Sequence, residues 1–420
     1  MKFLAVPTKR GLLFLLLTLS ALGVAFMNSG LLTAFTASVL SALLVSSFLM
    51  TLFSLAGMSV KRSFPQEGHC GSDLFIEIAV ENRFPLYRQE CVVLEELPFL
   101  LSGQYAFALP ALAPREKRNL SFRIKAEKRG EYRLEKVFLC SGDPLGLFRK
   151  KRCFFLPCAM EIHPRHFPLQ SLAAVNTHGG MPNAEGRALG HAGKGPEFFG
   201  VRPYRAGDEV RHIHWKTTAA KGKLMVKEFE AAAVDEIVIL LDTEKKRISP
   251  EPCDNNFEFL ISCAYSIAEY LSGRYCHLQL IAADGKEGGL HQISGDAASV
   301  KRPIRQLLTL LGSSDMPFSG ILSAAAESIP GGSIVYLFSM SRDPEPLAEM
   351  IGALEERDSR CFLLCAPGEN FPPIEPDRPR IVRREKLSGP YDPSVCTPLI
   401  ADFATKAEEL LEGGGPNERI

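Results

Sequence analysis

The stretch GLLFLLLTLSALGVAFMNSGLLTAFTASVLSALLVSSFLMTLFSLAGMSV, from Gly11 to Val60, contains no Asp, Glu, Lys, Arg or His. It is about twice as long as the ~20 apolar residues that cross the ~30 Å hydrocarbon core of a bilayer. A polar, turn-prone break at 28–30 interrupts it. The stretch therefore predicts two membrane-spanning helices, 11–27 and 31–56, joined by a short turn.

Basic residues flank both ends of this apolar stretch. Lys9 and Arg10 precede the first predicted helix, and Lys61 and Arg62 follow the second. Because positively charged flanks stay on the cytoplasmic side, both flanks are expected there. We therefore expect a multi-pass protein of a bacterial inner membrane, N-in and C-in, with the soluble part in the cytoplasm.

A cleaved signal peptide is the alternative interpretation of the N-terminus, since basic residues there precede an apolar core. Removal of the first span would leave the second in the chain. The eleven cysteines also argue against export, because their number is odd and they form neither a CxxC pair nor a zinc-ligand pattern. We expect reduced thiols in a cytoplasmic domain.

The charge is unevenly distributed behind the apolar stretch. Lys and Arg outnumber Asp and Glu between residues 61 and 230, and the reverse holds after residue 231. A basic part beside the membrane is expected to attract anionic lipid. No aromatic-interleaved basic motif indicates a nucleic-acid partner. The basic run 149–152 is interpreted as a solvated strand end, with a phosphate or lipid-headgroup contact as the alternative.

Two patterns follow along the chain. Residues 63–168 contain short alternating runs separated by turn residues, which is typical of an antiparallel β-sandwich. The expected strands there are 74–80, 91–94, 120–126, 132–140 and 153–162. After residue 231, apolar strands alternate with amphipathic helices, which predicts a mostly parallel sheet covered on both faces. The expected strands there are 236–242, 278–283, 333–339 and 361–365, and the expected helices are 257–272, 300–311, 320–328, 345–357 and 399–412.

These patterns predict a multidomain fold with two transmembrane helices, an all-β antiparallel sandwich and an α/β Rossmann-type domain. The expected parts are a transmembrane hairpin at 1–62, the β-sandwich at 63–168, a Gly-rich linker at 169–194, a motif-bearing segment at 195–230 and the α/β domain at 231–420.

The segment GPEFFGVRPYRAGDEVRHIHWKTTAAKGKLMVKEFE, residues 195–230, is the most informative part of the chain after the apolar stretch. Read as a strand, it places Arg211, Ile213 and Trp215 on one face, where the indole would anchor a core. Glu197, Arg202, Asp208 and Arg211 form a balanced set of two acids and two bases. The favoured interpretation is an ion-pair network where two domains meet. A ligand or partner site and a catalytic site are the alternatives.

This segment resembles the signature of the family called domain of unknown function 58. The matching positions are Glu197, Phe198, Gly200, Arg202, Tyr204, Gly207, Asp208, Arg211, Ile213, Trp215, Lys216 and Ala219. The two N-terminal spans and the RGxYxL and DPLGLF patterns at residues 129–134 and 143–148 agree with the same family. The resemblance implies a von Willebrand factor A-like C-terminal domain. It also implies MoxR-type AAA+ ATPases and other von Willebrand A proteins as partners.

Von Willebrand A domains hold a divalent ion with an Asp-x-Ser-x-Ser turn after the first strand. Here the corresponding turn is Asp242-Thr-Glu-Lys-Lys246, so Glu244 and Lys246 replace the two serines. An ammonium group at a ligand position repels Mg²⁺, which requires near-octahedral oxygen ligands. The sequence therefore predicts a degenerate site at Asp242, with no metal and no other cofactor.

No nucleotide-binding, hydrolase or metalloprotease motif occurs in the sequence. Our first hypothesis is a membrane-tethered, non-enzymatic interaction or scaffold protein that acts with a MoxR-type AAA+ ATPase in protein maturation or assembly. The alternatives are an enzyme of unrecognised type using the Glu197, Asp208 and Arg211 cluster, or a structural envelope protein. The expected interaction residues are Glu197, Arg202, Tyr204, Asp208, Arg211, Trp215 and Lys216.

Overall fold

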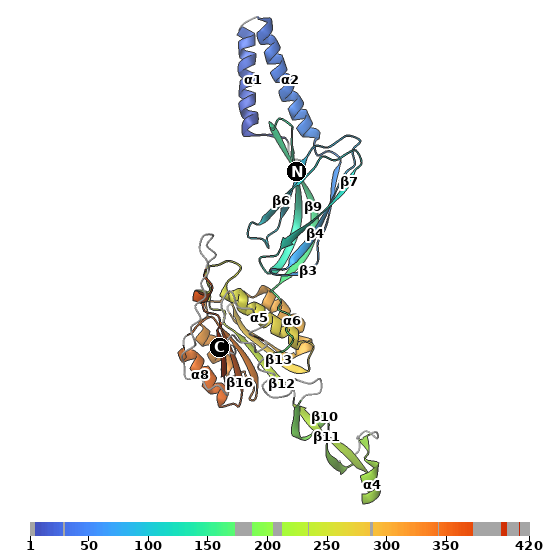
Figure 1. Ribbon diagram of the computed structural model, residues 1–420, viewed down its shortest axis with the longest axis vertical. Coiled ribbons are helices and arrows are strands. Elements are labelled where there is room, and N and C mark those ends of the chain that lie inside the picture. Colours follow the sequence, from blue (N-terminus) through green and yellow to red (C-terminus); the bar gives the residue numbers. More distant parts are fainter. Residues whose placement is uncertain are drawn as a thin grey trace, which may run out of the picture. The chain divides into compact units, whose positions relative to one another are not determined.

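The computed structural model of the chain describes residues 5–27, 30–172, 187–204, 212–233, 235–285, 289–342, 344–372, 396–400 and 411 (Figure 1). The chain divides into two compact units, Met1–His163 and Pro164–Ile420.

The first unit begins with the two predicted apolar helices. Helix α1 spans Lys9–Met27 and helix α2 spans Leu31–Phe53, and they form a hairpin (Figure 1). Among the described residues, these two helices are long and apolar enough to cross a membrane. Most of their apolar side chains are exposed, as expected of surfaces that face lipid. The two helices are consistent with membrane anchoring near the N-terminus.

The rest of the first unit consists of two sheets, mostly antiparallel. In one sheet the order is β1 (Val6–Pro7), β9 (Phe148–His163), β8 (Gly130–Gly142), β5 (Cys91–Glu96) and β6 (Gln104–Leu109), and β3 (Glu67–His69) pairs in parallel with β9. The other sheet has the order β2 (Met58–Ser63), β4 (Asp73–Asn82) and β7 (Lys117–Lys125). Alternate residues of β4 are buried, because side chains of a strand point to opposite faces. All five predicted strands are confirmed, and β1, β2, β3 and β6 were missed.

The turn between β8 and β9 packs against the helical hairpin. Leu147 and Phe148 form a small apolar cluster with Ala5, Phe14 and residues of α2. The side chain of Thr8 donates to the carbonyl of Gly146 at 2.7 Å, and the N–H of Gly11 donates to the Thr8 hydroxyl at 3.1 Å. Thr8 therefore caps the start of α1 and ties it to the turn.

The basic run 149–152 is more than the solvated strand end that the sequence suggested. Lys150 Nζ donates to the carbonyl of Leu52, and Arg152 Nη1 donates to the carbonyl of Leu55 at 2.8 Å. Carbonyls at a helix C-terminus lack partners within the helix and carry partial negative charge. Lys150 therefore binds a carbonyl in the last turn of α2, and Arg152 binds the chain just after the helix.

The second unit contains a six-stranded sheet. Its order is β14 (Gly289–Asp296), β13 (Cys276–Asp284), β12 (Asp235–Leu241), β15 (Ile334–Ser339), β16 (Arg360–Cys365) and β17 (Cys396–Ile400). All neighbours in this sheet are parallel except the pair of β13 and β14. This agrees with the mostly parallel sheet that the sequence predicts.

Helices cover both faces of this sheet (Figure 1). Helices α5 (Asn256–Leu271) and α6 (Ala297–Leu310) contribute to one core, and α7 (Phe318–Ala326) and α8 (Pro344–Glu355) contribute to the other. These four helices overlap the predicted ones. The predicted helix 399–412 is wrong at its start, because 399 and 400 continue strand β17 beside β16. Residues 401–410 and 412 lie outside the described residues.

A separate hairpin lies within the second unit. Strands β10 (Arg187–Pro203) and β11 (Met225–Ala233) pair antiparallel, and α4 (Trp215–Lys221) lies between them in the chain. The expected linker 169–194 therefore differs at both ends: Leu172 is buried in the α/β core, and 187–194 belongs to β10. Within β10, Gly193 pairs with Phe229 and Gly200 pairs with Glu228, with shifts of register along the strand. Residues 173–186 lie outside the described residues.

Candidate functional site at the carboxyl edge of the parallel sheet

The strand order identifies one edge of the α/β sheet as the candidate site. The chain leaves β12 toward β13 on one side, and leaves β15 toward β16 on the other. Open α/β sheets bind ligands where neighbouring strands connect in opposite directions, outside the carboxyl ends of the strands. Asp242 follows β12 directly, and Met340 follows β15 directly.

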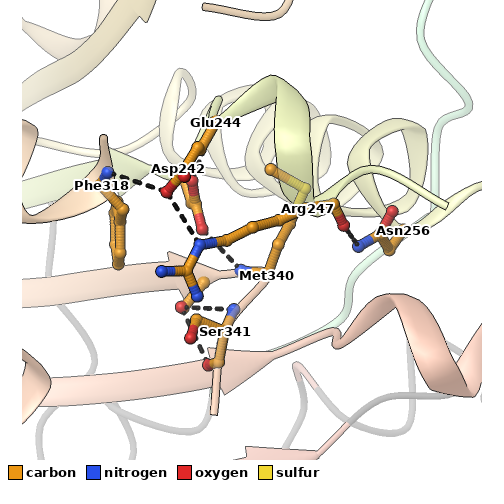
Figure 2. A network of polar contacts seen from close by, with 8 residues as sticks. Asp242, Glu244, Arg247, Asn256, Phe318, Met340 and Ser341 are labelled. Carbon is orange, nitrogen blue, oxygen red and sulfur yellow. Dashed lines mark hydrogen bonds and ion pairs between the residues drawn. The ribbon is translucent and has the colours of Figure 1, made fainter. Parts of the chain in front are cut away.

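Asp242 is fully buried at this edge, and backbone groups satisfy its carboxylate. Oδ1 accepts the N–H of Glu244 at 3.0 Å, and Oδ2 accepts the N–H of Met340 at 2.9 Å (Figure 2). Burial raises the pKa of Asp242 to about 6, although these two hydrogen bonds and the charge of Arg247 favour the ionised form. Asp242 thus links the ends of β12 and β15.

Glu244 carries the second carboxylate of the site. Its Oε2 accepts Nε of Arg247 at 2.8 Å and the N–H of Phe318 at 3.1 Å (Figure 2). Phe318 is the first residue of α7, so Glu244 pairs with a helix N–H that has no acceptor within the helix. The carboxylate that stands in the serine position therefore links the β12 edge to α7.

Arg247 brings a cation into the site. It ends the short 3₁₀ helix Lys245–Arg247, and its guanidinium extends from Glu244 toward the end of β15 (Figure 2). The side-chain amide of Asn256 donates to the Arg247 carbonyl at 2.9 Å, which fixes the 3₁₀ helix against the start of α5. The sequence comparison with the metal-binding turn missed Arg247. Its position three residues after Glu244 is the signal that could have indicated an ion pair.

These side chains do not fit a divalent cation. The carboxylate of Glu244 is engaged by Arg247, and Lys245 and Lys246 are exposed beside it. In the part of the chain that the structure describes, no three His, Cys, Asp or Glu side chains are grouped to hold a metal ion. Thr243 is fully buried, and its hydroxyl has no hydrogen-bond partner among the same residues. The carboxylates of Asp242 and Glu244 are both engaged by donors of the protein, so this set of side chains does not fit a divalent ion.

The structure places Trp215 differently from the predicted strand. Trp215 is the first residue of α4 and is 64% exposed, whereas Ile213 is buried and pairs with Val226. His214 caps the helix, because its Nδ1 accepts the N–H of Thr217 at 3.2 Å. The prediction that Trp215 anchors a core beside Ile213 is therefore wrong. Helix capping at His214 overrides the strand-like alternation of the sequence.

The other predicted site residues are placed in part. Arg202 Nη1 donates to the carbonyl of Pro203 at 3.1 Å, the N–H of Tyr204 donates to the carbonyl of Leu224 at 2.9 Å, and Lys216 is exposed in α4.

Glu197 lies in β10, while Asp208 and Arg211 lie outside the described residues. The network of two acids and two bases therefore stays a prediction.

Residues 200–318 match the family model described as "Protein of unknown function DUF58". The match supports the resemblance of this chain to the DUF58 family. The matched residues begin in β10 and end at the start of α7, so the DUF58 match contains Asp242, Glu244 and Arg247. An uncharacterised protein of Bacillus subtilis (strain 168), YeaD, is 24% identical to this chain over 300 residues, which are 70% of this chain and 72% of that protein. This relative supports the same family.

Solved structures give no further guidance. A β-glucosidase from Listeria innocua aligns with a TM-score of 0.18 and 17% identity, covering 25% of this chain and 16% of the enzyme. The CARDB domain of the PF1109 protein from Pyrococcus furiosus aligns with a TM-score of 0.19 and 14% identity, covering 25% of this chain and 91% of that domain. These likenesses are too low to carry an argument about fold or function.

Proposed function

We propose that this protein is a membrane-tethered, non-enzymatic interaction protein whose α/β unit binds an anionic partner segment at the carboxyl edge of its sheet. The observation that carries the proposal is the exposure of Lys245 and Lys246 beside the ion pair of Glu244 with Arg247 and the buried Asp242. Both carboxylates are engaged by protein donors, and Lys245 and Lys246 are exposed at the same edge. Such an edge offers positive charge to a partner and needs no metal.

We further propose that the α/β unit is a von Willebrand factor A-like domain with a degenerate metal site. Two features support this: the strand order of the sheet, with its antiparallel β14 at one edge, and an Asp directly after the first strand. In this proposal the guanidinium of Arg247 supplies the positive charge that a divalent ion supplies elsewhere. Isothermal titration of the purified protein with Mg²⁺ is expected to show no binding heat, and saturable binding would contradict the proposal.

The proposed partners are a MoxR-type AAA+ ATPase and other von Willebrand A proteins. The partner comes from the family resemblance. The proposed process is maturation or assembly of other proteins at the membrane. The test is co-purification of the cognate ATPase with the full-length protein in detergent, together with a measurement of ATPase turnover. Failure of the ATPase to co-purify, with turnover unchanged, would refute this partner.

The carboxyl edge is tested with the double variant Lys245→Ala/Lys246→Ala. Both side chains are exposed, so the fold is expected to survive while the edge loses two charges. Binding of the ATPase is expected to weaken several-fold. Arg302→Ala is the matched control, because Arg302 is an exposed cation on α6. Equal binding by the double variant and the wild type would refute the proposed edge.

The proposed orientation is N-in and C-in, with the chain behind the hairpin in the cytoplasm. It rests on the basic residues that flank the apolar stretch. Protease added to sealed inverted membrane vesicles should digest the chain behind the hairpin, and protease added to sealed right-side-out vesicles should leave it intact. The opposite pattern of protection would refute the orientation.

A further inference from the structure

The loop between β4 and β5, residues 83–90, exposes apolar side chains that the function proposed above does not use. Leu86 is 62% exposed, Tyr87 is 76% exposed and Phe84 is 37% exposed. Exposed apolar side chains that are clustered rather than scattered indicate an interaction surface. We call these residues the 83–90 loop.

The 83–90 loop is held against the end of helix α2. The N–H of Arg83 donates to the carbonyl of Gly57 at 2.9 Å, and Nη1 of Arg88 donates to the carbonyl of Phe53, the last residue of α2, at 2.8 Å. Gly57 has a φ of 73°, and a Cβ there would lie 3.0 Å from Cβ of Phe84. The loop is therefore fixed where the apolar helix ends.

Cations surround the same helix end. Besides Arg88, Lys150 donates to the carbonyl of Leu52 and Arg152 donates to the carbonyl of Leu55. The Arg88 guanidinium lies 4.4 Å from the centroid of the Phe84 ring. Its Nε and Nη2 are buried and find no acceptor among the described residues, and burial lowers the pKa of Arg88. The end of α2 thus combines positive charge with exposed apolar and aromatic side chains.

We propose that the 83–90 loop is a lipid-binding surface that lies in the headgroup region of the leaflet from which α2 emerges. Leu86 and Tyr87 contact the boundary between headgroups and acyl chains, and the half-buried Lys150 and the exposed Arg152 lie beside the phosphates. The buried Arg88 holds the loop against the end of α2. Tyr is enriched at this depth because its ring is apolar and its hydroxyl is polar, and basic side chains near helix ends extend toward the interface. This inference rests on the proposed membrane tether.

Depth-dependent fluorescence quenching tests this surface. The full-length variant Tyr87→Trp is prepared in a Trp215→Phe background, because Trp215 is the chain's only tryptophan. It is reconstituted into vesicles of phosphatidylcholine and phosphatidylglycerol in equal amounts, with part of the phosphatidylcholine brominated at a defined acyl position. We expect blue-shifted emission, and several-fold stronger quenching by bromine near the headgroups than by bromine near the bilayer centre.

Phe75→Trp in the same background is the matched control. Phe75 is 61% exposed on β4, and the pairing of β2 with β4 shows that it lies at the strand end away from α2. No quenching is expected there. Equal quenching at positions 75 and 87, or no quenching at position 87, would overturn the inference.

Extraction with alkaline carbonate separates the two proposals. A protein that stays in the membrane pellet but shows no quenching at position 87 retains the tether and loses the lipid-binding surface. A protein released by carbonate loses both the tether and the inference. Retention in the pellet with quenching confined to position 87 supports both.

Discussion

The ring of Phe48 in α2 meets the ring of Phe148 at the start of β9 edge to face, with centroids 5.4 Å apart and planes at 72°. Phe148 follows the turn between β8 and β9, so this contact joins the apolar hairpin directly to the β structure. Edge-to-face aromatic pairs contribute about 0.5–1.5 kcal/mol beyond the area that they bury. The helical hairpin and the sheets of the first unit are therefore packed together and are not joined by a free segment.

Replacing Phe148 with Ala is expected to destabilise the first unit by about 3 kcal/mol, the low end for Phe→Ala substitutions, because its apolar cluster is small. Denaturant unfolding of the full-length protein in detergent measures the effect. Phe155→Ala is the control, since Phe155 lies on the same strand and is 67% exposed. Equal stability of the two variants would show that the contact between Phe48 and Phe148 does not contribute.

Replacing Gly11 with Ala is expected to displace α1 from the turn between β8 and β9. A Cβ at Gly11 would lie 2.0 Å from the carbonyl oxygen of Leu147, so backbone must move, at a cost on the order of 1–3 kcal/mol. Gly23→Ala is the control in the same helix, because a Cβ there meets nothing within 4 Å. Thermal unfolding should show a lower melting temperature for Gly11→Ala only. A drop of equal size in the control would contradict this explanation.

Replacing Glu95 with Gln should flatten the pH dependence of stability. Glu95 is fully buried and paired with Arg62, and burial raises the pKa of Glu95 from 4.5 to about 7, although Arg62 favours the ionised form. A carboxyl group whose folded pKa is raised stabilises the fold at low pH and loses that contribution as pH rises from 4.5 to about 7.

Wild-type stability relative to Glu95→Gln should therefore fall across that interval. Urea unfolding at several pH values measures the difference. The control is Glu77→Gln, an exposed position on β4. The stability of this variant, plotted against pH, should run parallel to that of the wild type. If the stability of the wild type relative to Glu95→Gln grew with pH, the raised pKa of the buried Glu95 would be refuted.

Replacing Asp242 with Ala should leave the N–H groups of Glu244 and Met340 without their acceptor. An unsatisfied buried polar group costs about 1–3 kcal/mol, so a loss on the order of 2–5 kcal/mol is expected. The control is Asp296→Ala, because Asp296 is exposed and its side chain does not cap α6. Calorimetric unfolding tests this prediction. Stability unchanged by Asp242→Ala would mean that the link between β12 and β15 is dispensable.

The single tryptophan should report a solvent-exposed indole in the isolated protein. Trp215 is 64% exposed at the start of α4, so iodide should quench most of its emission. Fluorescence of the wild-type protein in detergent measures this directly. An emission that is blue-shifted and protected from iodide would restore the buried position that the strand-like alternation of 211, 213 and 215 had suggested.

Elements with strong local patterns could be predicted from the sequence. The charge-free stretch marked α1 and α2, and the apolar runs marked β12, β13, β15 and β16. Strand β2 was missed because its first residues continue the apolar stretch, and the chain turns at Gly57 before it enters the sheet. Edge strands such as β14 and β17 have weak apolar patterns and are specified by pairing with their neighbours.

The candidate site could be predicted only in part. Asp242 was identified as the last residue of a predicted strand, and the loss of the metal-ligand pattern followed from Glu244 and Lys246. The role of Arg247 depends on how the 3₁₀ helix turns its side chain back to Glu244, which residue types alone do not specify. For Trp215, a local cap at His214 was stronger than the two-residue period.

The sequence by itself determined that an apolar hairpin precedes a β region and an α/β region, because length, charge and periodicity are local properties of the chain. Only the tertiary structure decided which cations meet the last carbonyls of α2 and which backbone N–H groups hold Asp242. Those partners are far apart in sequence, as Lys150 and Leu52 are, or Met340 and Asp242. They come together because sheet register and strand order bring distant segments to one edge, and no local pattern encodes that arrangement.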